Sequence, residues 1–270
     1  MKQLISAVAV AFLSLSLSSC YKNPVTGRSS VNLVDDGQMR SLANQQYATF
    51  LSENPPISAS NSKDAEMVQR VGTRLSSAVQ TYLAQKGQSS LISGYQWQFN
   101  LVNNNQANAW CMPGGKVVVY SGIMPLAQNE NGLAAILGHE IAHAISRHGN
   151  ERMSQQLIVL AGGEALSAAL ANKPTQTKNI FNTVYGVGGT LGTLAYSRTH
   201  ESEADHMGLI FMALAGYNPN EALNFWMRMS AQGGPKPPEI LSTHPADATR
   251  IKQIKSWLPE AMTYYKPAGK

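Results

Sequence analysis

His139-Glu140-Ile141-Ala142-His143 is the most informative part of this chain. Side chains four positions apart lie on one face of an α-helix, so the two imidazoles can point at a single atom. Neutral imidazole nitrogens are ligands that zinc accepts in tetrahedral sites. Glu140 lies about 100° further round the helix, beside the metal, where its carboxylate can take a proton from a water molecule. The motif therefore predicts a helix that carries two zinc ligands and a base.

The residues around this motif favour a helix. Asn129 or Asn131 can cap its start, and Gly149 is placed to end it. An apolar stripe at helical spacing is formed by Leu133, Ile136, Leu137 and Ile141. Gly138 weakens a helix, so its position next to His139 indicates close packing against another element. The alternative is an ordinary buried helix whose two histidines are satisfied by hydrogen bonds.

The composition is that of a single globular domain. The chain has 270 residues, of which 43% are hydrophobic and 14% are charged, and it can bury one sizeable core. The net charge of +5 is scattered along the chain without a run of Lys and Arg. We therefore expect no nucleic-acid partner.

The first residues have the pattern of a secretory signal. A positive charge precedes residues 4–17, which are apolar with interspersed serines, and Leu17-Ser18-Ser19-Cys20 resembles a bacterial lipobox. We expect a lipoprotein signal peptide at 1–19 and a lipid on Cys20, which leaves Cys111 without a disulfide partner. The alternatives are an ordinary signal peptide or an uncleaved anchor. No later stretch is apolar for long enough to suggest a transmembrane helix.

The rest of the chain divides into a tether, a domain and a tail. Residues 20–34 are polar and turn-rich, and we expect them to tether a domain at 35–260, with a tail at 261–270. Helical periodicity or capping signals predict helices at 35–52, 63–85, 198–215 and from about 245 to 257.

Strands are expected before the His-Glu-x-x-His helix. Apolar residues alternate with polar ones through Tyr95, Trp97, Phe99 and Leu101. Residues 108–112 and 116–120 flank Pro113-Gly114-Gly115 and predict a hairpin. The expected fold is α+β: a mainly helical domain with a small antiparallel sheet beside the zinc-binding helix.

A third zinc ligand is expected from an acidic helix, because catalytic zinc sites commonly have three protein ligands. The candidates lie in Ser197-Arg198-Thr199-His200-Glu201-Ser202-Glu203-Ala204-Asp205. Glu201 and Asp205 share a helix face, so one carboxylate can bind zinc while the other holds a ligand imidazole. Glu203 is the competing ligand, and it lies about 200° round the helix from Glu201.

These motifs, in this order, resemble zinc metallopeptidase family forty-eight, which includes CAAX prenyl protease, HtpX, BepA and LoiP. The resemblance rests on His-Glu-x-x-His followed by Ser-Arg-x-x-Glu-x-x-Ala-Asp. Three further matches are Asn108-Ala109-Trp110 with Pro113-Gly114-Gly115, Arg147-His148, and Thr243-His244-Pro245 with Arg250. It covers about residues 35–257 and implies a zincin-like fold of the gluzincin type. Because the chain lacks the membrane helices of some members, it is most similar to the soluble lipoprotein branch of BepA and LoiP.

The resemblance implies a role for each matching residue. The ligands of one Zn²⁺ ion per chain would be His139, His143 and Glu201. Glu140 would be the general base, and Asp205 would orient a ligand imidazole. Glu203 is the less favoured third ligand, because Asp205 needs its neighbour four positions earlier on the same helix face.

His244 is assigned to the catalytic residues, with its role left open. It could donate to the developing oxyanion, occupy the water position on zinc as a removable latch, or simply begin a helix before a proline. The residues expected along the substrate are Asn108, Ala109 and Trp110. The substrate would add a strand to a sheet edge, supplied by 108–112 or 116–120.

The remaining histidines are expected to be structural. His148 follows His139 by nine positions, whereas the third histidine of metzincins follows the first by ten. His200 and His206 point away from the helix face of Glu201, so we expect surface or packing roles for both.

The resemblance implies a zinc-dependent endopeptidase of the bacterial cell envelope that hydrolyses unfolded or misassembled envelope proteins. Tyr21, rather than Asp, follows the lipidated cysteine, which indicates lipid anchorage in the outer membrane, facing the periplasm. One alternative is an envelope chaperone or assembly factor with a latched zinc site. A weaker one is a substrate-binding lipoprotein with a structural zinc, which would have no need of Glu140. The oligomeric state is not predicted.

Overall fold

The computed structural model describes residues 20–161, 174–185, 196–231, 240, 244 and 248–267. The strands are β1 (Cys20–Lys22), β2 (Ser29–Val31), β3 (Gln98–Val102), β4 (Ala109–Met112) and β5 (Lys116–Tyr120). The α-helices are α2 (Asp36–Glu53), α3 (Lys63–Gln85), α4 (Met124–Ala127), α5 (Glu130–Ile145), α6 (His148–Ala161), α8 (Pro174–Tyr185), α9 (Arg198–Leu214), α10 (Asn220–Ala231) and α12 (Ala248–Tyr264). Short 3-10 helices are η1 (Ser89–Ile92) and η2 (Ser121–Ile123). The predicted α+β, mainly helical fold is confirmed.

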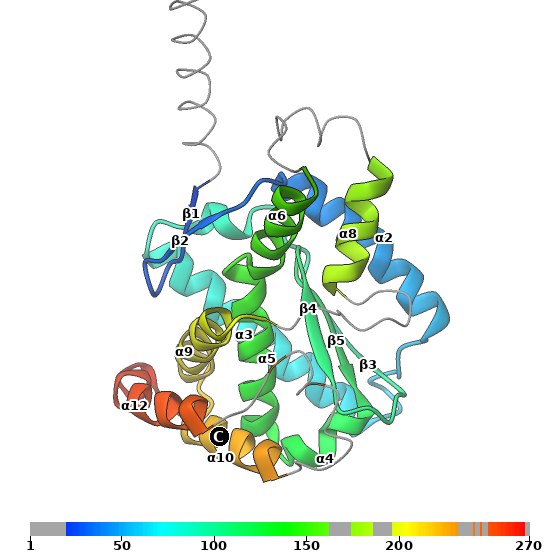
Figure 1. Ribbon diagram of the computed structural model, residues 1–270. Coiled ribbons are helices and arrows are strands. Elements are labelled where there is room, and N and C mark those ends of the chain that lie inside the picture. The colour runs from blue at the N-terminus through cyan, green and yellow to red at the C-terminus, as the bar shows by residue number, and fades with distance from the viewer. Residues whose placement is uncertain are drawn as a thin grey trace, which may run out of the picture.

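Helix α5 runs through the middle of the molecule, between the sheet and helix α9 (Figure 1). It packs against α9, α3, α10 and β4, so nearly all of its residues are buried. Asn129 caps its start, because the Asn129 side chain accepts a hydrogen bond from the backbone N–H of Gly132 at 3.0 Å. The hydrophobic core therefore surrounds and fixes the helix that carries His-Glu-x-x-His.

Helix α5 ends at Ile145, not at Gly149 as the sequence suggested. Arg147 adopts a φ of 56°, the left-handed conformation in which helices commonly end, and α6 begins at His148. Gly149 lies inside α6, where an added Cβ would overlap the hydroxyl of Tyr185. The break after α5 turns the chain so that α6 starts close to the zinc motif.

The crossing of α5 over α9 is close because each helix has a glycine at the contact. A Cβ on Gly138 would lie 3.0 Å from the carbonyl oxygen of Gly208, and a Cβ on Gly208 would lie 3.0 Å from the backbone nitrogen of His139. The close packing predicted at Gly138 is thus observed. It brings the backbone of α9 against the first residue of the zinc motif.

The sheet beside α5 has the order β3-β5-β4. Strands β4 and β5 form the predicted antiparallel hairpin, but β3 pairs with β5 in parallel, so the sheet is mixed rather than purely antiparallel. Strand β5 thus pairs with β4 on one side and with β3 on the other. All residues of the central strand β5 are buried, and β4 lies at an edge among the described residues.

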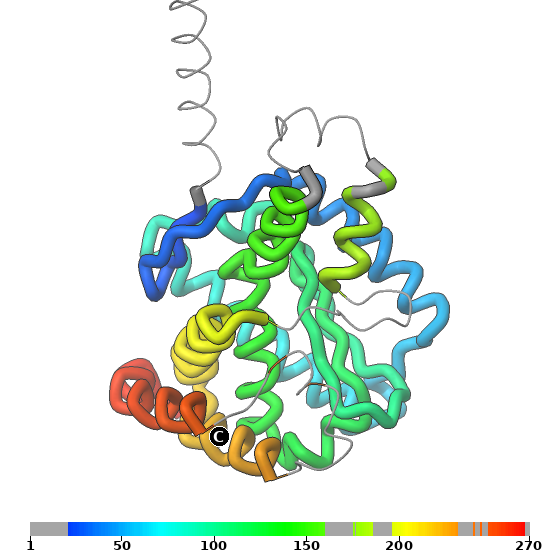
Figure 2. Tube along the Cα trace, viewed as in Figure 1, coloured from blue at the N-terminus to red at the C-terminus, as the bar shows by residue number. Residues whose placement is uncertain are grey.

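Residues 20–31 form a hairpin docked on the domain, which differs from the predicted tether. Strand β1 pairs antiparallel with β2, and the hairpin lies beside α6 although the two are far apart in sequence (Figure 2). Tyr21 is buried, and its hydroxyl donates to the carbonyl of Ile145 at 2.7 Å, across 124 positions of sequence. The predicted signal peptide at 1–19 lies outside the described residues.

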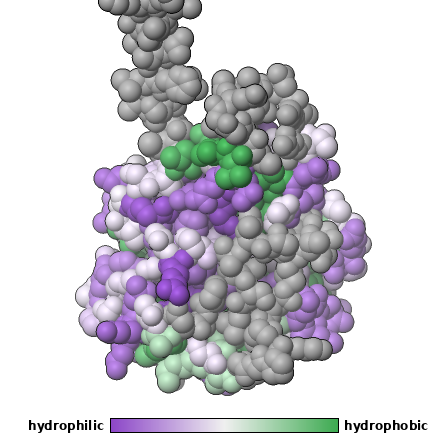
Figure 3. Space-filling view, viewed as in Figure 1, coloured by the Kyte–Doolittle hydropathy of each residue, from purple (hydrophilic) through white to green (hydrophobic). Residues whose placement is uncertain are grey.

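The last helix extends beyond its predicted end. Helix α12 runs to Tyr264 and includes Pro259, so the predicted tail at 261–270 is helical in its first part. Among the described residues, no helix has the length and apolarity to cross a membrane. Figure 3 shows a largely polar surface with a hydrophobic patch at the top, where β2 and α6 lie together and Val31, Ile158 and Val159 are exposed.

Candidate metal centre

Two imidazoles of α5 and one carboxylate of α9 meet in the core. The Nε2 atoms of His139 and His143 lie 3.0 Å apart. Glu201 Oε2 lies 3.4 Å from His139 Nε2, and Glu201 Oε1 lies 3.3 Å from His143 Nε2. All three side chains are buried. The structure thus brings together the three residues that the sequence analysis assigned as zinc ligands.

A fourth side chain, His244, enters the same cluster. Its Nδ1 atom lies 2.8 Å from Glu201 Oε1 and 3.1 Å from His139 Nε2. One donor atom from each of His139, His143, Glu201 and His244 lies within 4.8 Å of the other three. His244 therefore belongs to the group of residues that could hold a metal ion.

This donor set fits a zinc ion. Tetrahedral zinc with bonds of about 2.0–2.1 Å keeps its ligand atoms about 3.3 Å apart, close to the spacings of 2.8–3.4 Å within this cluster. Burial holds the pKa of His143 well below its usual range, so this imidazole is neutral and its nitrogen is free to coordinate. Three imidazoles and one carboxylate are donors that zinc accepts.

Negative charge gathers around His139. Burial alone would lower the pKa of His139, but the carboxylates of Glu201 and Asp205 raise it to about 9. The Glu201 carboxyl is also buried, yet His244, Arg250 and His139 hold its pKa well below the usual range, so it is ionised. A divalent cation at this point would be attracted by the carboxylates that already surround His139.

Glu140 is placed as the sequence predicts for a base. It is buried on α5, and its Oε1 atom has no hydrogen-bond partner among the described residues. The same atom lies 3.6 Å from His244 Nε2. Burial raises the pKa of the Glu140 carboxyl, which brings it nearer the range in which a carboxylate serves as a general base. A buried acceptor without a donor is a position where a water molecule or a substrate group can bind.

Asp205 holds the other side of His139. Its Oδ1 lies 2.9 Å from His139 Nδ1, as expected for a residue that orients a ligand imidazole. Arg250 binds Asp205 through two contacts of 2.7 Å each, and it ion-pairs with Glu201 at 2.8 Å. The Arg250 guanidinium lies over the ring of Trp226 at 3.4 Å. Arg250 was noted in the sequence only as part of a motif, without a role, because its partners lie on another helix.

Glu203 and His148 lie on the far side of His143. Glu203 does not join the metal cluster; its Oε2 lies 3.2 Å from His148 Nε2. His148 Nδ1 lies 2.8 Å from His143 Nδ1, so His148 contacts a ligand although the sequence suggested only a structural role. Tyr196 stacks on His143 with ring centres 4.0 Å apart, a contact that no sequence signal indicated.

The other two histidines keep to structural contacts. His200 is buried, stacks on His148 and lies 3.1 Å from Glu151. His206 pairs with Glu260 at 2.7 Å near the surface.

Among the residues expected to line the substrate, Asn108 and Ala109 are buried, and Trp110 packs edge-on against Phe50 and Tyr47. Residues 116–120 form the central strand and cannot offer a free edge to a substrate. The segment 108–112 contains the edge strand β4, and the backbone N–H of Ile240 donates to the carbonyl of Ala107 just before it.

A helix-borne His-Glu-x-x-His pair, completed by a glutamate from a second helix, is the arrangement that defines the gluzincin class of zinc peptidases. The model of peptidase family M48 matches residues 68–258. The chain therefore belongs to peptidase family M48.

The curated relatives include two groups. Mitochondrial metalloendopeptidase OMA1 of Schizosaccharomyces pombe is 37% identical over 172 residues, which are 63% of this chain and 49% of that protein. OMA1 of Saccharomyces cerevisiae is 37% identical over 186 residues, 66% of this chain and 52% of that protein. The beta-barrel assembly-enhancing protease of Yersinia pestis is 32% identical over 169 residues, 59% of this chain and 34% of that protein. The chain spans about half the length of the OMA1 proteins.

This comparison corrects the predicted location. The expectation of lipid anchorage in a bacterial outer membrane rested on Cys20 and the residues before it. The relatives with the higher identities, from two yeasts, are named mitochondrial proteins, and so are those from Bos taurus, Arabidopsis thaliana and Homo sapiens. By this comparison the prediction of a bacterial outer-membrane location is wrong.

Proposed function

We propose that this protein is a zinc-dependent endopeptidase that hydrolyses unfolded or misassembled proteins, with one Zn²⁺ ion held by His139, His143 and Glu201. The observation that carries this proposal is the buried Glu140 carboxylate, one oxygen of which accepts no hydrogen bond among the described residues, beside that donor set. A structural zinc site has no use for such a base. Membership in peptidase family M48 supports protein substrates.

Different side chains of this protein would carry out different steps of peptide hydrolysis. A zinc ion in the donor set supplies Lewis acidity to the scissile carbonyl and lowers the pKa of water toward 7. Glu140 would accept the proton of the attacking water on Oε1, which has no hydrogen-bond partner among the described residues, and pass it to the leaving amine. Asp205 keeps the proton of His139 on Nδ1, so that Nε2 stays available as a ligand.

Strand β4 lies at one edge of the sheet, and an extended substrate would add to it there. Binding of this kind uses backbone hydrogen bonds, which every unfolded chain can offer, and it reads side chains only weakly. This supports unfolded proteins as substrates, without a narrow sequence preference.

The substitution Glu140→Gln tests the proposal. It keeps the shape of the side chain but removes the base, so we expect full zinc content and a loss of casein hydrolysis of about 10²- to 10⁴-fold. Zinc is measured by elemental analysis of the purified protein, and hydrolysis is followed with and without chelator. Undiminished hydrolysis by the Glu140→Gln protein, or a wild type that contains no zinc, would overturn the proposal.

One observation favours a second function, as a chaperone or assembly factor whose zinc site is rarely open. All four clustered residues are at most 5% exposed, and His244 as a fourth ligand would fill the position that a catalytic site keeps for water. If this function dominates, the Glu140→Gln protein will suppress aggregation of an unfolded substrate as well as the wild type does. If hydrolysis dominates, that protection will be lost together with the peptidase activity.

A further inference from the structure

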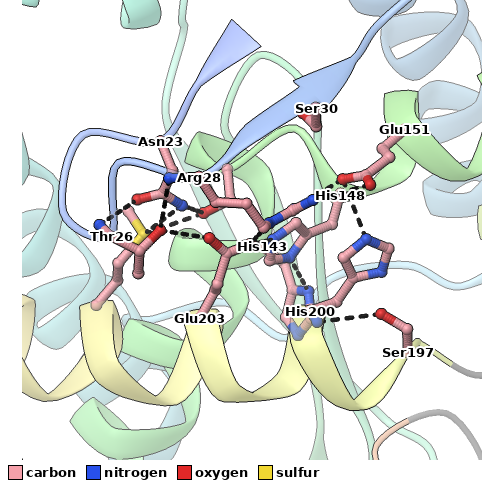
Figure 4. A network of polar contacts seen from close by, with 12 residues as sticks. Asn23, Thr26, Arg28, Ser30, His143, His148, Glu151, Ser197, His200 and Glu203 are labelled. Carbon is pink, nitrogen blue, oxygen red and sulfur yellow. Dashed lines mark hydrogen bonds and ion pairs between the residues drawn. The ribbon is translucent and has the colours of Figure 1, made fainter.

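A second polar network joins the candidate ligand His143 to the N-terminal hairpin (Figure 4). It leads from His143 through His148 and Glu203 to Thr26 and Arg28. The two histidines and the glutamate are at most 4% exposed, so their contacts are shielded from water. The network connects α5, α6, α9 and the hairpin, which are distant from one another in sequence.

The geometry gives each bond of this network a direction. His143 turns Nε2 toward the ligand cluster and Nδ1 toward His148. An imidazole that binds a metal through Nε2 carries its proton on Nδ1, so His143 donates to His148. His148 accepts on Nδ1 and therefore carries its own proton on Nε2, which faces Glu203 Oε2 at 3.2 Å. Each contact then has one donor and one acceptor, and the network ends on a carboxylate.

The hairpin fixes that carboxylate. Arg28 Nε donates to Glu203 Oε2 at 2.6 Å, and the hydroxyl of Thr26 donates to Glu203 Oε1. The remaining nitrogens of Arg28 bind both oxygens of Glu151 on α6 at 2.9 and 2.7 Å. A bidentate arginine contact of this kind fixes orientation as well as charge. The position of Glu203 therefore depends on residues that lie 175 and 177 positions away.

The hairpin is itself docked on the end of the helix that carries His143. Tyr21 donates to the carbonyl of Ile145, and the amide of Asn23 donates to Ser146 Oγ at 3.0 Å. Both contacts are buried. The hairpin thus holds the helix backbone just after His143 and, through Glu203 and His148, the imidazole of His143.

The two ligand histidines are supported in matching ways. His139 contacts Asp205, which Arg250 binds. His143 contacts His148, which Glu203 and then Arg28 support. A carboxylate held by an arginine fixes His139 directly and His143 through His148, and loss of such a partner typically reduces metal affinity about 10- to 100-fold.

We propose that His148 and Glu203 are positioning residues for His143, and that Thr26 and Arg28 of the docked hairpin complete this support, so that hairpin docking raises the zinc affinity of the site. The inference rests on the zinc site of the proposed function. It assigns residues 20–31 a part in assembling that site, in place of the passive tether that the sequence suggested.

The test compares zinc affinities of the whole chain carrying Glu203→Gln, Arg28→Met or Thr26→Val. Affinity is measured by competition with a chromogenic chelator, and stability is measured separately on the zinc-free protein. For Glu203→Gln we expect affinity to fall about tenfold or more. The two hairpin variants should show smaller losses in the same direction. Arg228→Met is the matched control, because Arg228 is about as exposed as Arg28 and pairs with Glu221 at 2.8 Å; its zinc affinity should not change.

Two further measurements separate positioning from a merely structural role. Cobalt(II) in place of zinc absorbs visible light in a way that reports ligand geometry, so its spectrum should shift in Glu203→Gln and Arg28→Met but not in Arg228→Met. When Glu203→Gln and Arg28→Met are combined in one protein, the losses of zinc affinity should be less than additive, because both residues act through one network.

The outcomes are distinct. Variants that fold and keep wild-type zinc affinity and an unchanged cobalt spectrum would overturn this inference alone. A wild type that binds no zinc would overturn the proposed function and this inference with it. If the Glu203→Gln protein does not fold, the zinc affinities of Arg28→Met and Thr26→Val test the inference. Both of these substitutions are at part-buried positions of the hairpin, where folding is less sensitive to a change.

Discussion

His244 Nδ1 lies 2.8 Å from Glu201 Oε1, inside the group of atoms that would surround a zinc ion. A catalytic zinc site keeps one position for water or substrate, and a zinc ion bound by the other three residues would have His244 within reach of that position. Of the roles that the sequence left open for His244, this contact favours a removable fourth ligand over an oxyanion donor.

The substitution His244→Ala should therefore raise basal peptide hydrolysis at equal zinc content. If the latch holds the site closed by about 1.4 kcal/mol, its removal raises the rate about tenfold. The measurement is the initial rate on casein, normalised to bound zinc. His206→Ala is the control, because that histidine pairs with Glu260 near the surface. A fall of about 10²- to 10³-fold for His244→Ala would instead identify an oxyanion donor.

Local features of the sequence predicted the elements that carry the site. Caps and periodicity gave α2, α3 and α9 nearly to the residue, because a helix is specified by neighbours within one or two turns. The four-residue spacing of His139 and His143 implied a shared helix face, and the structure places them on one. The helix angle also separated Glu201 from Glu203, which face different sides of α9.

Contacts between distant segments could not be predicted in this way. Arg28 meets Glu203 across 175 positions, and no local pattern marks either residue as a partner of the other. The parallel pairing of β3 with β5 likewise joins segments that a local pattern cannot orient relative to each other. A polar, turn-rich segment resembles a tether until Tyr21 and Asn23 are seen buried against the end of α5.

Arg250 is predicted to stabilise the fold as well as the site. Its loss removes the guanidinium that pairs with the buried carboxylates of Asp205 and Glu201, so Arg250→Leu should lower the free energy of unfolding by about 3–5 kcal/mol. Urea denaturation in the presence of chelator measures this apart from zinc binding. The Arg250→Lys protein should regain little of the lost free energy of unfolding, because one ammonium group cannot reproduce the two contacts to Asp205.

The control for Arg250 is Arg70, which forms ion pairs with Glu66 and Glu130 on the surface. Exposed pairs of this kind contribute less than about 1 kcal/mol to the free energy of unfolding, so Arg70→Leu should leave the midpoint of urea denaturation nearly unchanged. Equal effects of the two substitutions would contradict the assignment of Arg250 as the partner of the buried carboxylates.

Gly208→Ala is expected to destabilise the crossing of α9 and α5. In an open helix this change would add up to about 1 kcal/mol of stability. Here the new methyl group would lie 3.0 Å from the backbone nitrogen of His139, so we expect a loss of about 1–3 kcal/mol instead. Because the helices must separate, Glu201 should also move away from His139 and zinc affinity should fall. Thermal denaturation shows whether Gly208→Ala lowers or raises the stability, and a rise in Tm would refute the close-packing argument.

Glu151 is predicted to link the hairpin network to acid stability. Burial raises the pKa of its carboxyl, but hydrogen bonds from His200 and Arg28 outweigh burial and lower the pKa to about 2 from an ordinary value of 4.5. The unfolded chain therefore binds the proton more readily than the native protein. This contribution to stability is complete above about pH 4.5 and is lost as the pH falls toward 2.

In the zinc-free protein, Glu151→Gln removes this contribution at every pH. Above about pH 5 the free energy of unfolding of the wild type should exceed that of the variant by the largest amount. This difference should shrink as the pH falls toward 2. It should change by at most about 1.4 kcal/mol per pH unit, because one proton is involved. Urea denaturation of both proteins at several pH values between 6 and 2.5 measures the difference. If the difference in free energy of unfolding stayed constant over this pH range, the Glu151 carboxyl would have the same pKa in the native and unfolded states. Its bonds to Arg28 and His200 would then not favour the ionised form.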